Sequence, residues 1–181
     1  APAALAVTTS ASGAEYTLTA QKDAAAQDLI YQHQSVNAAN AGAVAVEMGH
    51  AYSKLSFLAT AGNGYTGAAN LTQVQITGGI YATGTLNMVD GKVDPVGTAT
   101  LTLAAGEKAL VIPMAGQPTI AVTCTIDGKE FTANIKADTM PSLLAGVEYE
   151  ITLTVVGQEA VISSVKEVPW TTTKVDGGTI F

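Results

Sequence analysis

Two histidines, His33 and His50, are the residues of this chain best suited to acid–base chemistry. His50 lies in the segment VAVEMGHAYSKLSFLAT (44–60). A catalytic imidazole needs a carboxylate that orients it and a nucleophile or metal ion within hydrogen-bonding reach. The nearest carboxylate along the chain, Glu47, is separated from His50 by a glycine. We therefore interpret His50 as a hydrogen-bonded structural residue, and His33 in the same way.

The remaining reactive side chains predict neither a metal site nor a catalytic triad. The spacing of the histidines matches no metal-binding motif, and DGKVD (90–94) lacks the register of a calcium loop. The single cysteine, Cys124, excludes an intrachain disulfide. In TIAVTCTID (119–127) it shares a strand face with Ile120 and Val122, as a small buried hydrophobic residue would. We expect no enzymatic activity and no cofactor.

The composition is that of a sparsely charged globular domain. Apolar residue types make up 48 % of the 181 residues and charged types 13 %, a balance that favours folding over disorder. The 15 acidic residues outnumber the 8 basic ones, all of them lysine, so the arginine fork suited to phosphates is missing. We expect no nucleic-acid partner. No segment reaches the roughly 20 apolar residues of a transmembrane helix, which predicts no transmembrane segment.

Alternation of apolar and polar residues dominates the chain and predicts an all-β protein. The clearest case is GVEYEITLTVVG (146–157), in which Tyr149, Ile151 and Leu153 share one face while glutamate and threonine occupy the other. This pattern is typical of an antiparallel strand with one buried face. Shorter runs of this kind occupy 15–20, 71–78, 79–88, 98–103, 108–113, 119–126, 130–137 and 160–168. Together they favour a β-sandwich with little helix.

The connecting segments agree with this prediction. VDGK (89–92) and IDGK (126–129) are Asp-Gly hairpin signals, because both central positions of a type I′ turn need a positive φ. The Gly-Gly pair at 78–79 predicts a turn. Helical signal is confined to about two turns within 22–32 and a single turn at 140–146.

A further strand is expected at 51–59, directly after His50. Its alternation places Leu55 and Phe57 in the buried row and His50 with Lys54 on the opposite face. The residues that we expect to form the structural core are His50, Leu55, Phe57, Cys124, Tyr149, Ile151 and Leu153.

The domain organisation that we expect has three parts: an N-terminal arm (1–35), which is a candidate remnant of a first β domain, a β-sandwich (36–170) and a C-terminal extension (171–181). The extension ends on two large apolar residues, without the charge of a disordered tail. It could be the last strand of its own sandwich, with Trp170 capping the core. Alternatively, a groove of another molecule would bind Trp170, Val175, Ile180 and Phe181.

Several motifs occur in a telling order: DLIYQ (28–32), HAYSKL (50–55), ALVIPMAGQPTIAVTCTIDGKEF (109–131), LLAGVEYEITLTV (143–155) and VKEVPW (165–170). Together they resemble the fimbrillin-like proteins of Bacteroidales surface pili. In that family an Asp-Leu pair precedes a strand carrying His-Ala-x-Ser/Ala-Lys-Leu, Gly-x-x-Tyr opens a long strand, and a tryptophan closes it. The match covers about residues 28–170 and resembles the second of the family's two domains.

The resemblance implies a transthyretin-like or Ig-like antiparallel β-sandwich with Greek-key-type connections. It also implies an exported structural pilus subunit at the cell surface, associated with the outer membrane, that polymerises head to tail by strand exchange and supports cell adhesion. Its partners would be copies of itself, other pilus subunits, and host or bacterial surface receptors. The extension 171–181 would be the donor strand, with Trp170, Val175, Ile180 and Phe181 as its polymerisation tail.

The energetics set a condition on this mechanism. Ordering about a dozen extension residues costs on the order of 18 kcal/mol. Burying four large apolar side chains and forming about eight strand hydrogen bonds returns roughly 17 kcal/mol. Tight association therefore requires an acceptor that already exposes apolar surface and unpaired strand edges. The alternative function is a non-polymerising surface adhesion or carbohydrate-binding module, for which Tyr65 and Tyr81 are the aromatic candidates.

Overall fold

The computed structural model describes residues 7–10, 13–24, 27–32, 48–116 and 119–170, and the regular elements within them are all β-strands. Sheet I contains, in spatial order, β1 (Val7–Ser10), β2 (Gly13–Thr19), β8 (Thr83–Asn87) and β9 (Val93–Val96). Sheet II contains β10 (Ala99–Ala104), β7 (Leu71–Ile80), β13 (Ile120–Ile126) and β14 (Lys129–Ile135). Sheet III contains β17 (Glu159–Pro169), β16 (Val147–Val156), β6 (Ser53–Ala61), β11 (Ala109–Val111) and β3 (Gln21–Lys22).

Two short ladders complete the fold: β12 (Met114–Ala115) pairs with β15 (Ser142–Leu143), and β4 (Ile30–Tyr31) pairs with β5 (Gly49–His50). The predicted all-β class and sandwich architecture are confirmed. Most pairings are antiparallel, but β6 and β16 run parallel, with Leu55 opposite Tyr149. A parallel pair needs a long crossover, and here the chain between the two strands builds sheet II and two strands of sheet I, β8 and β9.

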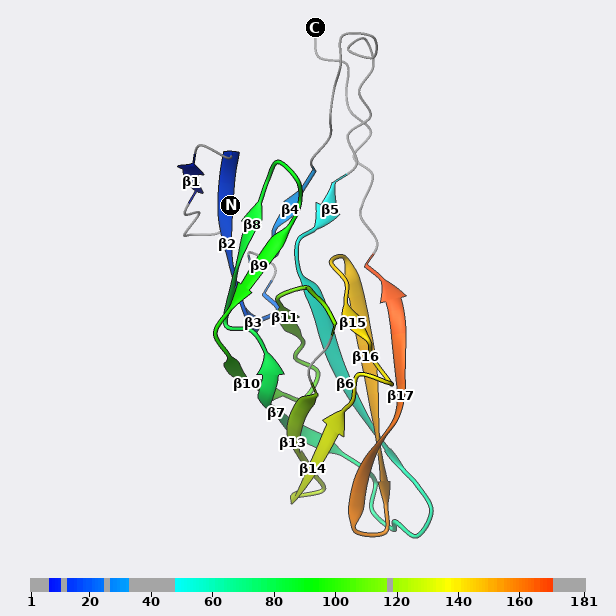
Figure 1. The fold of residues 1–181 in the computed structure, drawn as a ribbon. Helices are drawn as coiled ribbons and strands as arrows, with labels where there is room; N and C mark the ends of the chain where they lie inside the picture. Colours follow the sequence, from blue (N-terminus) through cyan, green and yellow to red (C-terminus); the bar gives the residue numbers. More distant parts are fainter. Residues whose placement is uncertain (1–6, 11–12, 25–26, 33–47, 117–118, 171–181) are drawn as a thin grey trace, which may run out of the picture.

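The described residues form two hydrophobic cores, and Figure 1 shows the strands that contribute to them. The larger core lies between sheets II and III. The smaller core joins Leu18 and Leu86 of sheet I to the chain around β6 and β11. In β11, Val111 contacts the larger core and Leu110 the smaller one, so both faces of this strand are buried. Sheet III therefore lies between two apolar layers at its β11 end.

The N-terminal residues contribute strands to this body. Tyr16 of β2 lies opposite Leu86 of β8, and Lys22 of β3 lies opposite Ala109 of β11. The interpretation of 1–35 as a remnant of a first domain stays a prediction.

The strand β6 differs from the expected one-sided pattern. Its first five residues, Ser53–Phe57, are all buried, and Lys54, which was expected on the open face, is only 7 % exposed. The second face is covered because the smaller core lies against it. The buried polar residues remain satisfied: the Ser53 hydroxyl donates to the Leu144 carbonyl, 2.8 Å away, and the Ser56 hydroxyl donates to Glu148 at 2.7 Å.

The two Asp-Gly turns are built differently. Between β13 and β14, Asp127 and Gly128 have φ values of 50° and 76°, as a type I′ turn requires. Between β8 and β9 only Gly91 takes a positive φ, of 71°, because this loop is longer. The turn predicted at 78–79 is wrong, since β7 continues through both glycines to Ile80.

Neither predicted helical segment is helical within the described residues. The segment 22–32 contains the end of β3 and the whole of β4, and 140–146 contains β15. An isolated two-turn helix is marginal in water, whereas pairing with β11, β5 and β12 satisfies the backbone directly. Within the described part of the chain, no helix has the length and apolar character needed to cross a bilayer.

Candidate functional site

His50, the candidate catalytic residue of the sequence, is held by a carboxylate that lies far away along the chain. The pairing of Ile30 with His50 in the β4–β5 ladder brings the preceding segment alongside it. As a result, Nδ1 of His50 lies 2.6 Å from Oδ2 of Asp28. The two side chains are only 10 % and 18 % exposed.

Trp170 packs against the imidazole ring of His50. It follows directly after β17, and its ring stacks on the His50 ring with centroids 3.9 Å apart and planes inclined by 6°. The ammonium of Lys54 lies 3.5 Å from the centroid of the Trp170 ring and 2.8 Å from Oδ2 of Asp23. Such a cation–π contact is worth about 2 kcal/mol when it is desolvated. We call Asp23, Asp28, His50, Lys54 and Trp170 the Trp170 clasp.

The geometry of the clasp suits a structural joint better than a catalytic centre. Nε2 of His50 is buried without a hydrogen-bond partner in the described structure, and Trp170 stacks on its ring. A catalytic imidazole must present a nitrogen to its substrate. No three His, Cys, Asp or Glu side chains of the described ranges are grouped so that they could hold a metal ion. The clasp instead fastens the N-terminal segment, the start of β6 and the end of β17 together.

A second charged group lies beside the clasp. Burial raises the pKa of Glu148, but hydrogen bonds from Lys108 and Ser56 and the nearby charge of Lys54 outweigh burial, so the pKa falls below its ordinary value of 4.5. The Lys108 ammonium donates to Oε1 of Glu148 at 2.7 Å. Glu148 is therefore ionised at neutral pH and complements the buried lysine.

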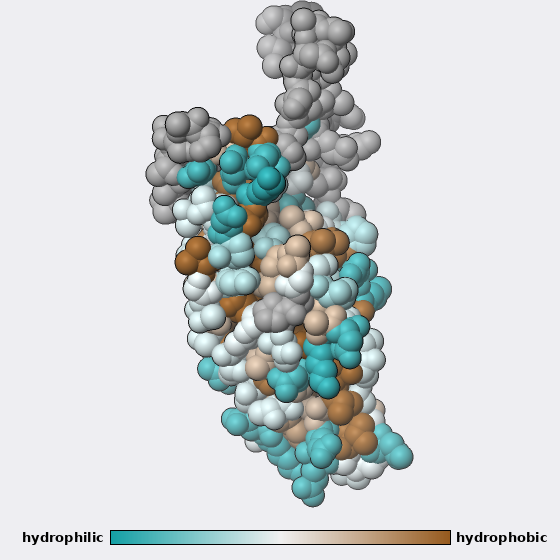
Figure 2. All heavy atoms as spheres, viewed as in Figure 1, coloured by the Kyte–Doolittle hydropathy of each residue, from teal (hydrophilic) through white to brown (hydrophobic). Residues whose placement is uncertain are grey.

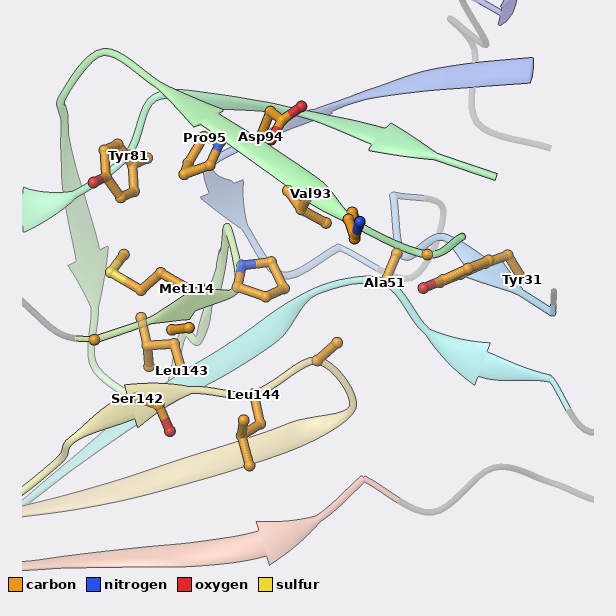
Figure 3. A pocket seen from close by; sticks show the side chains of 16 residues that line it. Tyr31, Ala51, Tyr81, Val93, Asp94, Pro95, Met114, Ser142, Leu143 and Leu144 are labelled. Carbon is orange, nitrogen blue, oxygen red and sulfur yellow. The ribbon is translucent and has the colours of Figure 1, made fainter. Parts of the chain in front are cut away.

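A groove of about 710 Å³ opens between sheet I and the β12–β15 ladder (Figure 3). Its walls are runs of consecutive residues, 91–95 on one side and 113–116 and 142–145 on the other, with Tyr31, Ala51 and Tyr81 completing the lining. Strand residues of β9 therefore line the groove on one side, and strand residues of β12 and β15 line it on the other. On the face shown in Figure 2, exposed hydrophobic residues are scattered among polar ones.

One wall of the groove is the edge strand of sheet I, β9. The N–H of Asn87 donates to the carbonyl of Lys92, and antiparallel pairs alternate the direction of their backbone groups. At the pair Gly84↔Pro95, the backbone of β9 therefore faces away from β8, toward the open edge. Because proline has no N–H, an incoming strand finds one donor fewer there, which limits pairing along this edge.

The predicted core residues all occur in the larger core or in the clasp. Leu55, Phe57, Cys124, Tyr149, Ile151 and Leu153 belong to the larger core, and His50 belongs to the clasp. Burial raises the pKa of the Cys124 thiol to about 11, so this side chain is neutral and unreactive. Of the predicted polymerisation tail, Trp170 contacts its own chain, whereas Val175, Ile180 and Phe181 lie outside the described residues, as does His33.

Sequence reasoning missed Asp28 and Asp23 as partners of His50 and Lys54. The signal was present in the motifs, because the aspartate of DLIYQ, the histidine and lysine of HAYSKL and the tryptophan of VKEVPW are the residues that meet in the clasp. Tyr81, an aromatic binding candidate, lines the groove. Tyr65 instead donates a hydrogen bond to Asp127.

Comparisons with known proteins point to one family. The sequence profile described as fimbrillin-like matches residues 2–170. A crystal structure of a candidate cell adhesion protein from Bacteroides uniformis aligns with a TM-score of 0.57 and 24 % identity over 68 % of this chain and 52 % of that protein. A candidate cell adhesion protein from Bacteroides ovatus aligns with a TM-score of 0.51 and 15 % identity over 89 % of this chain and 70 % of that protein.

These structural similarities concern the fold. The chain spans about half the length of the Bacteroides uniformis structure that it matches. No curated protein matches the sequence at a significant level.

Proposed function

The chain belongs to the fimbrillin-like family, and from this premise we propose that it is a structural pilus subunit that polymerises head to tail by strand exchange and supports cell adhesion. In this proposal the protein is exported to the cell surface as part of a fimbrium associated with the outer membrane. Its partners are copies of itself or other pilus subunits, and it is not an enzyme. The extension 171–181 is the donor strand.

The observation that carries the proposal is the groove beside β9. It combines an open sheet edge with a lining that includes the partly exposed Tyr81 and Val93 and the half-exposed Leu144 (Figure 3). A strand added here would gain the backbone hydrogen bonds that the edge offers on either side of Pro95 and would cover the apolar side chains that water now reaches. The groove therefore supports the proposal, because it offers apolar surface and a sheet edge of the kind that the energetic condition requires.

The sequence of the extension suits an added strand. If 171–181 were extended, Val175 and Phe181 would share one face, separated by the small residues Gly177 and Thr179. A contact between the extension of one copy and the groove of the next is heterologous, because it joins two different surfaces. Contacts of this type do not close into a dimer and can propagate as a filament.

Electron microscopy of the full chain and of a chain ending at Trp170 tests the donor. We expect filaments from the full chain and folded monomers from the shortened one, with folding checked by circular dichroism. The full-length double variant Val175→Asp/Phe181→Asp should also stay monomeric. Its matched control, Thr171→Asp/Thr173→Asp, adds the same charge without removing an apolar residue and should still assemble. Equal assembly of the full and shortened chains would contradict the proposal.

The acceptor is tested by substituting a groove residue whose side chain is already exposed. Leu144 lines the groove and is 50 % exposed, so Leu144→Lys should block assembly without disturbing the cores. Leu58 offers a matched control, since it is also a leucine, is 48 % exposed and lines a different hollow, next to Ala68 and Leu71. Filaments from Leu58→Lys and none from Leu144→Lys would support the groove as the acceptor.

The alternative function is a non-polymerising adhesion or carbohydrate-binding module. The observation that favours it is the presence of two tyrosines, Tyr31 and Tyr81, in the lining of the groove. Monomers from every variant, together with binding of an oligosaccharide that is lost in Tyr81→Ala, would favour this function over polymerisation.

A further inference from the structure

Resting on the proposed function, we propose that the Trp170 clasp anchors the point at residue 170 from which the C-terminal extension starts, and that it directs the extension away from its own subunit. Trp170 is thus a positioning residue for donation, although its side chain does not enter the acceptor. A subunit with an open clasp would still accept an extension, but it would donate its own poorly.

The first observation is where the β16–β17 hairpin ends. Pro169 lies opposite Val147, the first residue of β16. The Trp170 N–H then donates to the carbonyl of Gly146 at 2.9 Å. Gly146 has a φ of 73° and donates its own N–H to the carbonyl of Tyr52, so the chain turns away from β17 at this point. Strand β16 therefore provides no further residue with which residue 171 could pair.

The second observation is how firmly Trp170 is held at that point. Its ring contacts His50 and Lys54 at 3.9 and 3.5 Å. Each of these partners is fixed in turn by a carboxylate from the N-terminal segment, Asp28 or Asp23. The clasp thus joins chain segments from the beginning, middle and end of the described body directly before the extension starts.

The physical consequence concerns the entropy of donation. An extension whose first attachment point, Trp170, is already fixed loses less conformational freedom when it docks than one whose attachment point is free. Ordering one additional residue costs enough free energy to change an association constant by about tenfold. The clasp removes that cost in advance, since Trp170 is already ordered in the free subunit.

The test mixes two full-length variants, one defective as a strand donor and the other defective as a strand acceptor. Trp170→Ala should need an about tenfold higher concentration to polymerise than the unmodified chain, while its groove stays intact. Leu144→Lys should not polymerise because its groove is blocked, but its extension and clasp remain. When the two are mixed, we expect heterodimers, detected by native mass spectrometry, in which Leu144→Lys is the donor. Adding Val175→Asp/Phe181→Asp to the Leu144→Lys chain should abolish them.

This complementation separates positioning from general damage. A Trp170→Ala chain that is merely destabilised would lose its acceptor function as well, so the absence of heterodimers would overturn the inference. Trp170→Leu keeps apolar bulk but cannot stack on His50 or bind the Lys54 cation, and it should behave in the same way if Trp170→Ala does not fold. Val161→Ala, at a 43 % exposed position of the same strand, is the control and should polymerise normally.

Failure of this inference is distinguishable from failure of the proposed function. If deletion of 171–181 abolishes filaments while Trp170→Ala and Trp170→Leu polymerise at the same concentration as the unmodified chain, only the clasp inference is wrong. If deletion of 171–181 leaves assembly unchanged, strand donation itself is wrong, and the positioning role of Trp170 fails with it.

Discussion

At the scale of single residues, Asp127 shows how one carboxylate can organise a loop. It accepts hydrogen bonds from the Tyr65 hydroxyl at 2.6 Å and from the N–H groups of Ala69 and Asn70 at 2.9 and 3.0 Å. These donors lower the pKa of Asp127 below its ordinary value of 3.8, the Tyr65 hydroxyl contributing most. The residue therefore fixes the loop between β6 and β7 while it also forms the β13–β14 turn.

The substitution Asp127→Ala should loosen this loop without unfolding the sheets. It removes the carboxylate that accepts these three hydrogen bonds, so we expect amide exchange at Ala69 and Asn70 to accelerate by roughly tenfold. Asp127→Asn keeps one acceptor oxygen and tolerates the positive φ, and should accelerate exchange less. Hydrogen exchange followed by NMR measures both effects. Unchanged protection at Ala69 in Asp127→Ala would show that other contacts hold the loop.

The same carboxylate gives a pH dependence with a definite sign. Because folding lowers the pKa of Asp127, its stabilising contribution is complete above pH 3.8 and is lost as the pH falls through the lower pKa of the folded state. Protection of Ala69 should therefore be constant from pH 7 down to about pH 4 and decrease only below it.

At the scale of elements, the Gly78–Gly79 pair shows why β7 can be long. Gly79 has a φ of 82°, and a Cβ placed on it would lie 2.3 Å from the backbone oxygen of Thr119. Gly78 has no atom within 4 Å of such a Cβ and no positive φ. Only the second glycine is required by the close approach of β13 to β7.

Adjacent alanine substitutions should therefore differ sharply. Gly79→Ala combines a left-handed backbone with a collision against backbone atoms, so we expect it to cost at least about 2 kcal/mol of the free energy of unfolding. Gly78→Ala, the matched control, should change that free energy by less than about 0.5 kcal/mol. Urea denaturation measures both values, and equal stabilities of the two variants would refute the explanation.

At the scale of the whole molecule, β11 couples the two hydrophobic cores. Neighbouring residues of this strand face opposite layers, Leu110 the smaller core and Val111 the larger one, and both are fully buried. Because one strand belongs to both layers, neither core can open while the other keeps its packing.

Truncating a side chain on either face of β11 should lower the midpoint temperature of one common unfolding transition. Leu110→Ala should cost about 2 to 5 kcal/mol and Val111→Ala somewhat less, since it deletes a smaller side chain. We expect calorimetry to show a single unfolding transition for each variant. A second, separate transition in Leu110→Ala would show that the smaller core and sheet I unfold independently.

The sequence predicted the strands of the sandwich well because its alternating pattern records burial on one face. Strand β16 shows this most clearly: Tyr149, Ile151 and Leu153 are fully buried and the residues between them are partly exposed. The prediction failed where a second layer covers the other face, as in β6, and where short strands pair with distant edges, as β3 and β4 do. Local patterns carry no information about what a distant segment covers.

The candidate site, like the fold, was predictable from the sequence only in part. The sequence by itself determined which residues carry the family motifs, and it favoured a structural rather than a catalytic role for His50. Only the tertiary structure decided that Asp28, His50, Lys54 and Trp170 meet in one clasp and that β9 borders an open groove. Both features join segments that are far apart along the chain, and their contacts depend on strand pairing and layer packing that no local pattern specifies.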